Sequence, residues 1–252
     1  MINIFKKFNN FKNNIKKNNI LIGAWMQISS TEIADIFSSN KIFDWVCADL
    51  EHGNINYEKL ADIFRIIQLN GKIPFARLKS HDQNEVQKIL DLGAMGIILP
   101  KIENSKDLIK IIDGCIPSPH GKRGHAFFRA NMFGKYFEEY NKHFKKPIII
   151  AMIETRMGLE CLNDILSVKK LDGIFVGPYD LSASMGITGK FNSKKYTEAI
   201  NKIINLTKNK KKIVGIHVVE NSKKLFDENI KKGFKFIAYS MDTVLINNIN
   251  KL

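Results

Sequence analysis

Short apolar segments separated by polar, turn-forming residues recur along the whole chain. Several of them, such as PIIIAMIE at 147–154, are continuously apolar rather than alternating, as is typical of strands buried on both faces of a parallel sheet. The pattern predicts eight strands, over residues 20–28, 45–51, 72–78, 96–100, 147–154, 173–178, 212–218 and 234–240.

Amphipathic stretches of helical length lie between these strands, and Ser or Asp often stands where such a stretch begins, as a helix cap should. The predicted helices cover residues 30–39, 57–70, 82–92, 105–114, 158–170, 193–209, 222–232 and 242–252. Regular alternation of strand and helix indicates βαβ units with parallel strands. Eight repeats in 252 residues predict an α/β fold, a single (β/α)8 TIM barrel that forms one domain over residues 1–252.

Two segments depart from this alternation. Residues 1–19 carry apolar side chains at helical spacing, so we expect an N-terminal helix that caps the bottom of the barrel. The alternative is that these apolar side chains form one face of a helix lying on a membrane surface. Residues 115–146 form a long insertion after the fourth helix, and their Phe and Tyr content favours an ordered segment. The N-terminal stripe consists of Ile4, Phe5, Phe8, Phe11 and Ile15.

The formal charge of +14 comes mainly from lysine, because only five of the 39 basic residues are arginine. The lysines are spread along the predicted outer faces of helices, so we expect no nucleic-acid partner, although the charge favours anionic substrates. No apolar run approaches the roughly 18 residues of a membrane span, and no signal peptide is apparent. Cys47, Cys115 and Cys161 are isolated, which indicates a reducing, cytoplasmic location and no zinc site.

Polar residues at the C-terminal ends of the strands are the candidates for chemistry, because that end of a (β/α)8 barrel carries the active site. Residues at several strand ends, most of them charged or polar, are expected to converge there on one mouth. They are Asp49, Glu51 and His52 after the second strand, Arg77 after the third, Glu154 after the fifth, Gly177, Pro178, Tyr179 and Asp180 after the sixth, and His217 in the seventh.

Glu154 and Asp180 are the natural metal ligands among these residues. Two carboxylates, completed by water and a chelating substrate, form an oxygen-rich site that suits Mg²⁺, Mn²⁺ or Co²⁺. Structural alternatives remain open: either acid can cap a helix, Arg77 can pair with a neighbouring carboxylate, and His52 can be a loop histidine. We interpret His217, which lies inside an apolar strand, as a hydrogen-bonded core residue.

Two features of other barrel enzymes are missing from the sequence. No Gly-rich phosphate loop follows the last two strands, which disfavours a phosphorylated substrate. No lysine ends the sixth strand, a usual Schiff-base position in barrel aldolases. Lys79 and Lys101, just past the third and fourth strands, remain alternative nucleophiles.

Six segments in a fixed order carry a family resemblance. They are WVCADLEHG (45–53), FARL (75–78), KILDLGAMGIILP (88–100), RGHAFFRA (123–130), MIETRMGLECL (152–162) and GIFVGPYDLSASMG (173–186). From about residue 21 to 252, the chain resembles the HpcH/HpaI aldolase family of class II, metal-dependent pyruvate aldolases. This family includes 4-hydroxy-2-oxoheptanedioate aldolase and 2-dehydro-3-deoxyglucarate aldolase. The combined motifs are highly specific, whereas any one alone is weak.

The resemblance implies cleavage of a 4-hydroxy-2-oxo acid to pyruvate and an aldehyde through a metal-bound pyruvate enolate. It would place Glu154 and Asp180 on the metal and Arg77 at the keto oxygen. His52, oriented by Asp91 and supported by Asp49, would act in proton transfer, directly or through water.

The resemblance also implies a substrate-binding set made of Asp49, Met152 and the backbone of Gly177, Pro178 and Tyr179. Many relatives have Gln in place of Met152 and a small residue in place of Tyr179. These two departures leave the metal and enolate machinery intact but leave the natural substrate open.

The family further implies a homohexamer, a trimer of dimers that exchange C-terminal helices. Apolar residues in the last helix, which need a partner, agree with this expectation. They are Val244, Leu245, Ile246 and Ile249. Two other functions remain as alternatives: an enolate-forming lyase of the citryl-CoA or malyl-CoA type, and a catalytically silent barrel that serves as a binding module.

Overall fold

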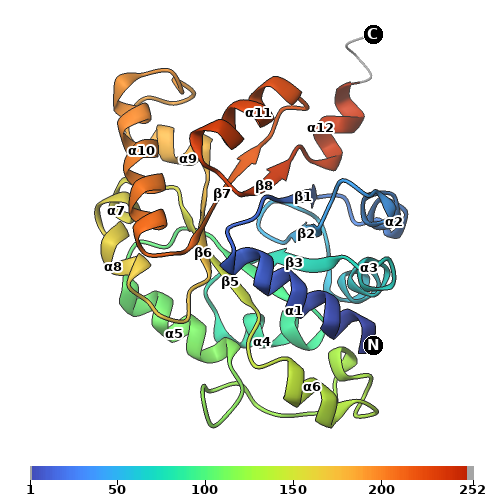
Figure 1. The fold of residues 1–252 in the computed structure, drawn as a ribbon. Helices are drawn as coiled ribbons and strands as arrows, with labels where there is room; N and C mark the ends of the chain where they lie inside the picture. The colour runs from blue at the N-terminus through green and yellow to red at the C-terminus, as the bar shows by residue number, and fades with distance from the viewer. Residues whose placement is uncertain (1, 249–252) are drawn as a thin grey trace.

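Eight parallel strands close into a barrel in the computed structural model, which describes residues 2–248 (Figure 1). Each strand pairs with the next in chain order, and β8 pairs with β1. The strands are β1 Leu21–Met26, β2 Trp45–Asp49, β3 Ile73–Arg77, β4 Gly96–Leu99, β5 Ile148–Ile153, β6 Gly173–Val176, β7 Ile213–Val218 and β8 Phe236–Tyr239. The predicted TIM barrel is confirmed, with each strand at its predicted place or slightly shorter.

The helices surround the barrel, and six of them begin at a Ser, Asn or Asp whose side chain accepts a backbone N–H of the first turn. The helices are α1 Ile2–Lys16, α2 Thr31–Ser39, α3 Tyr57–Leu69, α4 Gln83–Asp91, α5 Ser105–Cys115, α6 Phe137–His143, α7 Arg156–Glu160, α8 Leu162–Leu166, α9 Pro178–Ser184, α10 Lys194–Asn209, α11 Lys223–Lys232 and α12 Asp242–Asn247.

Two helices differ from the prediction. The helix expected over 158–170 is divided into α7 and α8, because the backbone of Cys161 (φ −83°, ψ 6°) departs from helical geometry. The short helix α9 was not among the predicted helices, because Pro178 was assigned to the end of the sixth strand. Proline is favoured at the first helical position, where its missing N–H has no partner to lose, and that is the place of Pro178.

Aromatic side chains fill the inside of the barrel. The rings of Trp45 and Phe236 stack with their centres 4.2 Å apart, and Phe75 lies 5.2 Å from Trp45. Helix α1 closes this core from the N-terminal ends of the strands, where Phe8 is fully buried and Phe11 lies 6.0 Å from Phe75 (Figure 1). The apolar stripe of residues 1–19 is therefore part of the core, as expected for a capping helix.

The insertion at 115–146 is ordered by two buried arginines. Arg123 donates to the carboxylate of Asp91 at 2.6 Å and to the hydroxyl of Tyr140 at 3.1 Å. Arg129 donates to the backbone carbonyl of Leu92 and to Gln68. Both arginines thus attach the insertion, which contains the 3-10 helix Arg129–Asn131 and α6, to the end of α4.

Helix α12 follows β8 and leaves apolar surface uncovered. Leu245 packs against the core, whereas Ile246 is 49% exposed. The predicted end of this helix, including Ile249, lies outside the described residues. Within residues 2–248, no helix combines the length and the apolar character needed to cross a bilayer.

Candidate active site

Asp49 and Arg77 form a buried ion pair at the ends of β2 and β3. Arg77 donates from Nε to Asp49 Oδ1 at 2.8 Å and from Nη2 to Asp49 Oδ2 at 2.5 Å. Burial opposes ionisation of Asp49, but the hydrogen bonds and charge of Arg77 outweigh it and hold the pKa of this carboxyl below its usual value. The guanidinium also lies 3.2 Å from Glu51 and 5.2 Å from the ring of Trp25. Arg77 is therefore fixed on several sides.

The loop after β2 is folded around the same carboxylate. Asp49 Oδ1 accepts the backbone N–H of Glu51 at 3.1 Å and that of His52 at 3.3 Å. Gly53 completes the turn, because a Cβ there would lie 2.2 Å from the carbonyl oxygen of Asp49. Asp49 thus places the backbone of His52, while the exposed imidazole ring has no hydrogen bond to another described residue.

Glu154 is 2% exposed and lies immediately after β5. Its Oε1 accepts the backbone N–H of Lys101 at 2.7 Å. Burial, opposed by that hydrogen bond and reinforced by the charges of Glu51 and Asp180, raises the pKa of Glu154 to about 7. The adjacent Thr155 is the residue that caps α7, so Glu154 does not serve as its cap.

Asp180 comes from the first turn of α9, and its charge acts on Glu154. The cap of this helix is Gly177, so Asp180 does not fill that role either. Gly177 also passes close to Glu154, since a Cβ at this position would lie 2.6 Å from Glu154 Oε2. The close approach of the backbone leaves Glu154 Oε2 at the boundary between β5 and β6.

These two carboxylates fit a divalent cation. Glu154 Oε2 accepts no hydrogen bond from a described residue, and the negative charge of Asp180 disfavours ionisation of Glu154. A positive ion between them would remove that repulsion and supply the missing partner. Within residues 2–248, no group of three His, Cys, Asp or Glu side chains is arranged to hold a metal, so water and substrate would complete the coordination.

A cavity of about 220 Å³ opens at this end of the barrel. It brings together seven residues that the sequence predicts for the site: His52, Arg77, Met152, Gly177, Pro178, Tyr179 and Asp180. Met152 is 3% exposed, whereas Tyr179 is 46% exposed at the mouth. Asp49 and Glu154 border this cavity, because Asp49 is hydrogen-bonded to Arg77 and Glu154 lies against Gly177, and both of those residues line it.

His217 also lines this cavity, from β7. Its Nε2 lies 3.1 Å from the backbone carbonyl oxygen of Ser240, so this nitrogen carries the proton and donates it. The ring stacks on Trp25 with centres 4.9 Å apart. Burial lowers the pKa of His217 to about 4, which keeps the imidazole neutral near pH 7. The predicted hydrogen-bonded histidine is thus found, at the edge of the site.

Asp91 has Arg123, not His52, as its partner within one chain. It is the last residue of α4, which runs antiparallel to the strands and ends at the bottom of the barrel. There its carboxylate is paired with Arg123. Asp91 and His52 make no contact in the described part of this single chain, and the role of Asp91 beside His52 stays a prediction.

The two lysines considered as nucleophiles occupy different surroundings. Lys101 Nζ pairs with Glu51 at 3.1 Å, and its side chain is 62% exposed. Lys79 Nζ lies 5.8 Å from the ring centre of Tyr57 and does not line the cavity. A Schiff-base lysine is usually buried in the active site, whereas both of these lysines are exposed, and the hydrogen bond to Glu51 raises the pKa of Lys101.

Sequence reasoning missed Gln27, which follows β1. Gln27 Nε2 donates to Asp49 Oδ2 at 3.0 Å, and Gln27 lines the cavity. Its backbone N–H, with that of Ile28, donates to the buried carboxylate of Asp242. The position of Gln27 at a strand end was the available signal, but an uncharged amide does not stand out among catalytic residue types.

Comparison with known proteins finds relatives of this chain among aldolases. Residues 21–248 match the family model of the HpcH/HpaI aldolase/citrate lyase family. The chain is 29% identical to a hydroxypyruvate/pyruvate aldolase of Roseobacter denitrificans, over 96% of this chain and 94% of that protein. It is 28% identical to a 4-hydroxy-2-oxo-heptane-1,7-dioate aldolase of Shigella flexneri, over 94% of this chain and 89% of that protein.

A solved structure gives the same fold. An HpcH/HpaI aldolase/citrate lyase family protein from Burkholderia cenocepacia J2315 superposes with a TM-score of 0.89 at 25% identity, covering 96% of each chain. Because the family model covers most of the sequence and the barrel matches a solved relative, the chain belongs to the HpcH/HpaI aldolase/citrate lyase family.

Proposed function

We propose that this chain is a class II aldolase, a carbon–carbon lyase that cleaves 4-hydroxy-2-oxo acids to pyruvate and an aldehyde. One observation carries the proposal: a single cavity contains Arg77, His52 and Asp180, next to the buried Glu154. The aldolase names of the relatives from Roseobacter denitrificans and Shigella flexneri support the same reaction class.

Glu154 and Asp180 would hold the divalent cation, Mg²⁺, Mn²⁺ or Co²⁺. When bound, such an ion supplies Lewis acidity to the keto oxygen of a 2-oxo acid and helps to orient its carboxylate. The backbone of Gly177 to Asp180 lines the same cavity and would contact that carboxylate.

Arg77 would stabilise the charge that develops when the C3–C4 bond breaks. The bonding electrons move toward C2, and negative charge appears on the keto oxygen as the enolate forms. A guanidinium already held by Asp49 and Glu51 needs no reorganisation to donate hydrogen bonds to that oxygen. Further N–H groups of Arg77 remain for this purpose, since Asp49 takes two of the five.

His52 would transfer the protons, directly or through water. Cleavage removes the proton of the C4 hydroxyl, whose oxygen becomes the aldehyde, and a proton must later reach C3 to give pyruvate. The cavity has two imidazoles, and His217 already donates to Ser240 and stays neutral. The His52 ring is exposed and makes no hydrogen bond to another described residue, so we assign proton transfer to it.

Met152 and Tyr179 would determine the choice of substrate rather than the enolate chemistry. Met152 presents a thioether where many relatives carry Gln, so it offers an apolar contact in place of an amide hydrogen bond. Tyr179 stands at the mouth, where a ring restricts access more than a small residue does. We therefore expect Met152→Gln to change the ranking of aldehydes while exchange of the pyruvate C3 protons continues.

The test is an activity screen of the purified protein. After treatment with EDTA, Mg²⁺, Mn²⁺ or Co²⁺ is added and pyruvate release is measured from a panel of 4-hydroxy-2-oxo acids. Exchange of pyruvate C3 protons for deuterium, followed by NMR, reports enolate formation without any aldehyde. We expect both activities to need the added ion.

Two controls separate the alternatives. Citryl-CoA and malyl-CoA in the same screen test the lyase alternative, which would show cleavage of the thioester substrates instead. Borohydride treatment with pyruvate should leave the protein mass unchanged, because no Schiff base forms. Absence of C3 exchange with all three ions would contradict the proposed function and favour a silent barrel.

A further inference from the structure

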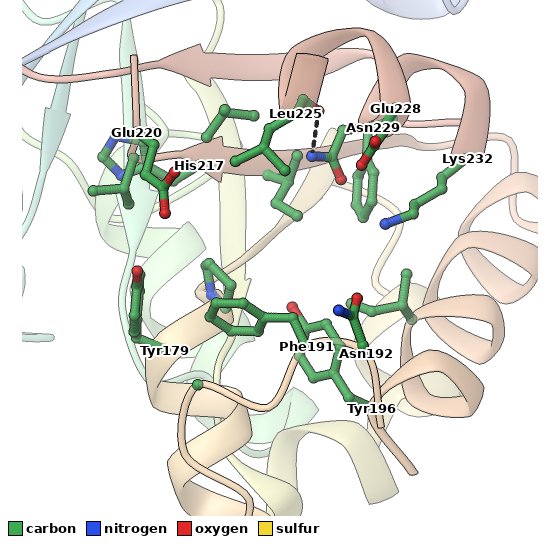
Figure 2. A pocket seen from close by; sticks show the side chains of 17 residues that line it. Tyr179, Phe191, Asn192, Tyr196, His217, Glu220, Leu225, Glu228, Asn229 and Lys232 are labelled. Carbon is green, nitrogen blue, oxygen red and sulfur yellow. Dashed lines mark hydrogen bonds between the residues drawn. The ribbon is translucent and has the colours of Figure 1, made fainter. Parts of the chain in front are cut away.

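A second cavity, of about 350 Å³, lies between α10 and α11 beside the candidate active site (Figure 2). It shares Pro178, Tyr179, His217 and Val219 with the site cavity, so the two have a common wall. Figure 2 shows Tyr179 and His217 at one end of this groove and Lys232 toward the other. A molecule held in the groove would therefore extend away from the site along β7.

One wall of the groove is an unusual face of α11. Leu225, Glu228, Asn229 and Lys232 recur at helical spacing (i, i+3, i+4, i+7), the spacing that normally carries the apolar contacts of a helix with the core. Here three of the four positions are polar, and they line a cavity (Figure 2). None of the residues of α11 is fully buried. The polar side chains of Glu228, Asn229 and Lys232 thus line the groove.

The opposite wall is aromatic. The rings of Tyr179 and Phe191 are 5.1 Å apart and nearly perpendicular, at 83°, and those of Phe191 and Tyr196 are 5.3 Å apart. The Tyr196 hydroxyl has no hydrogen bond to another described residue, and burial raises its pKa above the usual value. This wall offers ring faces and edges together with a phenolic donor.

We propose that the groove binds the non-reacting part of the aldehyde and selects uncharged aldehydes whose chain bears an aromatic ring with a hydroxyl substituent. This inference rests on the proposed aldolase function. The aromatic wall fits a planar ring, and the polar face of α11 fits the hydroxyl. A cavity of about 150 Å³ already holds benzene, so about 350 Å³ has room for a substituted ring.

The charges of the groove favour an uncharged ligand. Glu220 and Glu228 contribute two carboxylates to the lining, and Lys232 is the one cation among the residues that form it. A terminal carboxylate or phosphate on the aldehyde would meet net negative charge at close range. A hydroxyl, in contrast, can donate to Glu228 and accept from Lys232 or Tyr196.

The first experiment compares two aldehydes in the addition reaction with pyruvate: 4-hydroxybenzaldehyde and acetaldehyde. In Leu225→Trp, an indole would fill the groove from α11. The matched control is Ile230→Trp, on the same helix but outside the groove lining. We expect Leu225→Trp to lower the preference for 4-hydroxybenzaldehyde, as a ratio of kcat/KM values, by about tenfold or more, because loss of a pocket contact typically costs that much. Ile230→Trp should leave the ratio unchanged.

A milder pair of variants removes one wall instead of filling the groove. Phe191→Ala takes away the central ring, and Ile36→Ala removes an exposed apolar side chain of α2 as its control. We expect Phe191→Ala alone to reduce the preference for 4-hydroxybenzaldehyde. An unchanged preference in both Leu225→Trp and Phe191→Ala, with the proteins folded by circular dichroism, would overturn the inference.

Two further readouts separate this inference from the proposed function. Pyruvate C3 exchange needs no aldehyde, so it should be equal in all four variants. Binding of 4-hydroxybenzyl alcohol, measured by saturation-transfer NMR, needs no turnover and should be lost in Leu225→Trp. If C3 exchange is absent while binding of 4-hydroxybenzyl alcohol depends on Leu225, ligand binding in the groove is supported and the aldolase proposal fails. If Leu225→Trp instead changes the oligomeric state and leaves aldehyde preference intact, a second copy covers the groove and the inference is wrong.

Discussion

Asp49 and Arg77 are partners in the register between β2 and β3, and two hydrogen bonds join their side chains across the strands. The pair is buried, and the same carboxylate also holds the backbone of His52. One structural element thus positions both the group proposed to stabilise the enolate and the group proposed to move its protons.

Arg77→Lys should abolish most activity and also reduce stability. An ammonium cannot reproduce the two-pronged contact with Asp49, so part of that buried carboxylate loses its partner. Breaking a buried ion pair typically costs about 3–5 kcal/mol, and this substitution should approach that range. Urea unfolding measures the loss. Arg65→Lys, in an exposed pair with Asp62, is the control and should unfold like the wild type.

Glu154→Ala and Asp180→Ala should each weaken metal binding and reduce pyruvate release below detection. Either change removes one of two protein ligands, and EDTA should have the same effect on the wild type until a divalent ion is restored. Isothermal titration with Mn²⁺ measures the affinity. Glu160→Ala is a suitable control, because this exposed residue pairs only with Arg156. Full activity in the chelated wild type would remove the metal from the proposal.

His52→Ala should lose turnover while binding metal normally, since the imidazole lies outside the proposed ligand pair. General acid–base groups typically contribute about 10²–10⁴-fold, which sets the expected decrease in kcat. Replacement of the exposed His120 by Ala controls for loss of a surface histidine. Near-normal turnover in His52→Ala would assign proton transfer to another group.

His217 should make the protein sensitive to acid. Its folded-state pKa of about 4 lies below the ordinary value of 6.5, so between these values the unfolded chain binds more protons and stability falls as the pH falls. At about 1.4 kcal/mol per pKa unit, the loss by pH 4 is on the order of 3 kcal/mol. Urea unfolding from pH 7 to pH 4 measures it. In His217→Asn this part of the pH dependence should disappear, and an unchanged slope would contradict the assignment.

The protein should form a homohexamer, or at least a dimer. Ile246 and the exposed Phe127 and Phe133 of the insertion leave apolar surface on the single chain, which association would cover. Multi-angle light scattering at micromolar concentration measures the mass. A measured mass of 28.8 kDa, that of a monomer, would contradict both this expectation and the exchange of C-terminal helices.

The sequence predicted the barrel because its signals are local. A buried strand such as 148–153 is continuously apolar, and side chains at strand ends must share one rim, which is why Arg77, Glu154 and Asp180 could be grouped in advance. The position of Asp91 shows the limit of motif reasoning. A residue near the end of a helix in a βαβ unit belongs to the opposite rim of its own chain, so strand and helix polarity predict that Asp91 and His52 do not meet within one chain.

Other parts depend on tertiary contacts that leave no local pattern. One wall of the groove beside the site is α11, a helix without a fully buried residue. In the sequence, the polar positions of α11 that line the groove cannot be distinguished from a solvent-exposed helix face. The pKa of Glu154 likewise depends on burial and on Glu51 and Asp180, which come from two other strand ends.

The contact of Asp242 with the end of β1 has a consequence for synthesis of the protein. Gln27 is bound to Asp49 on one side and to Asp242 on the other, and β1 obtains its second neighbour from β8. A nascent chain whose β8 and Asp242 are still inside the ribosome lacks both partners of β1 and cannot close the barrel beneath Gln27. The surroundings of Asp49 should therefore be completed only after β8 and Asp242 have emerged, however early the first strands and their helices have begun to pair.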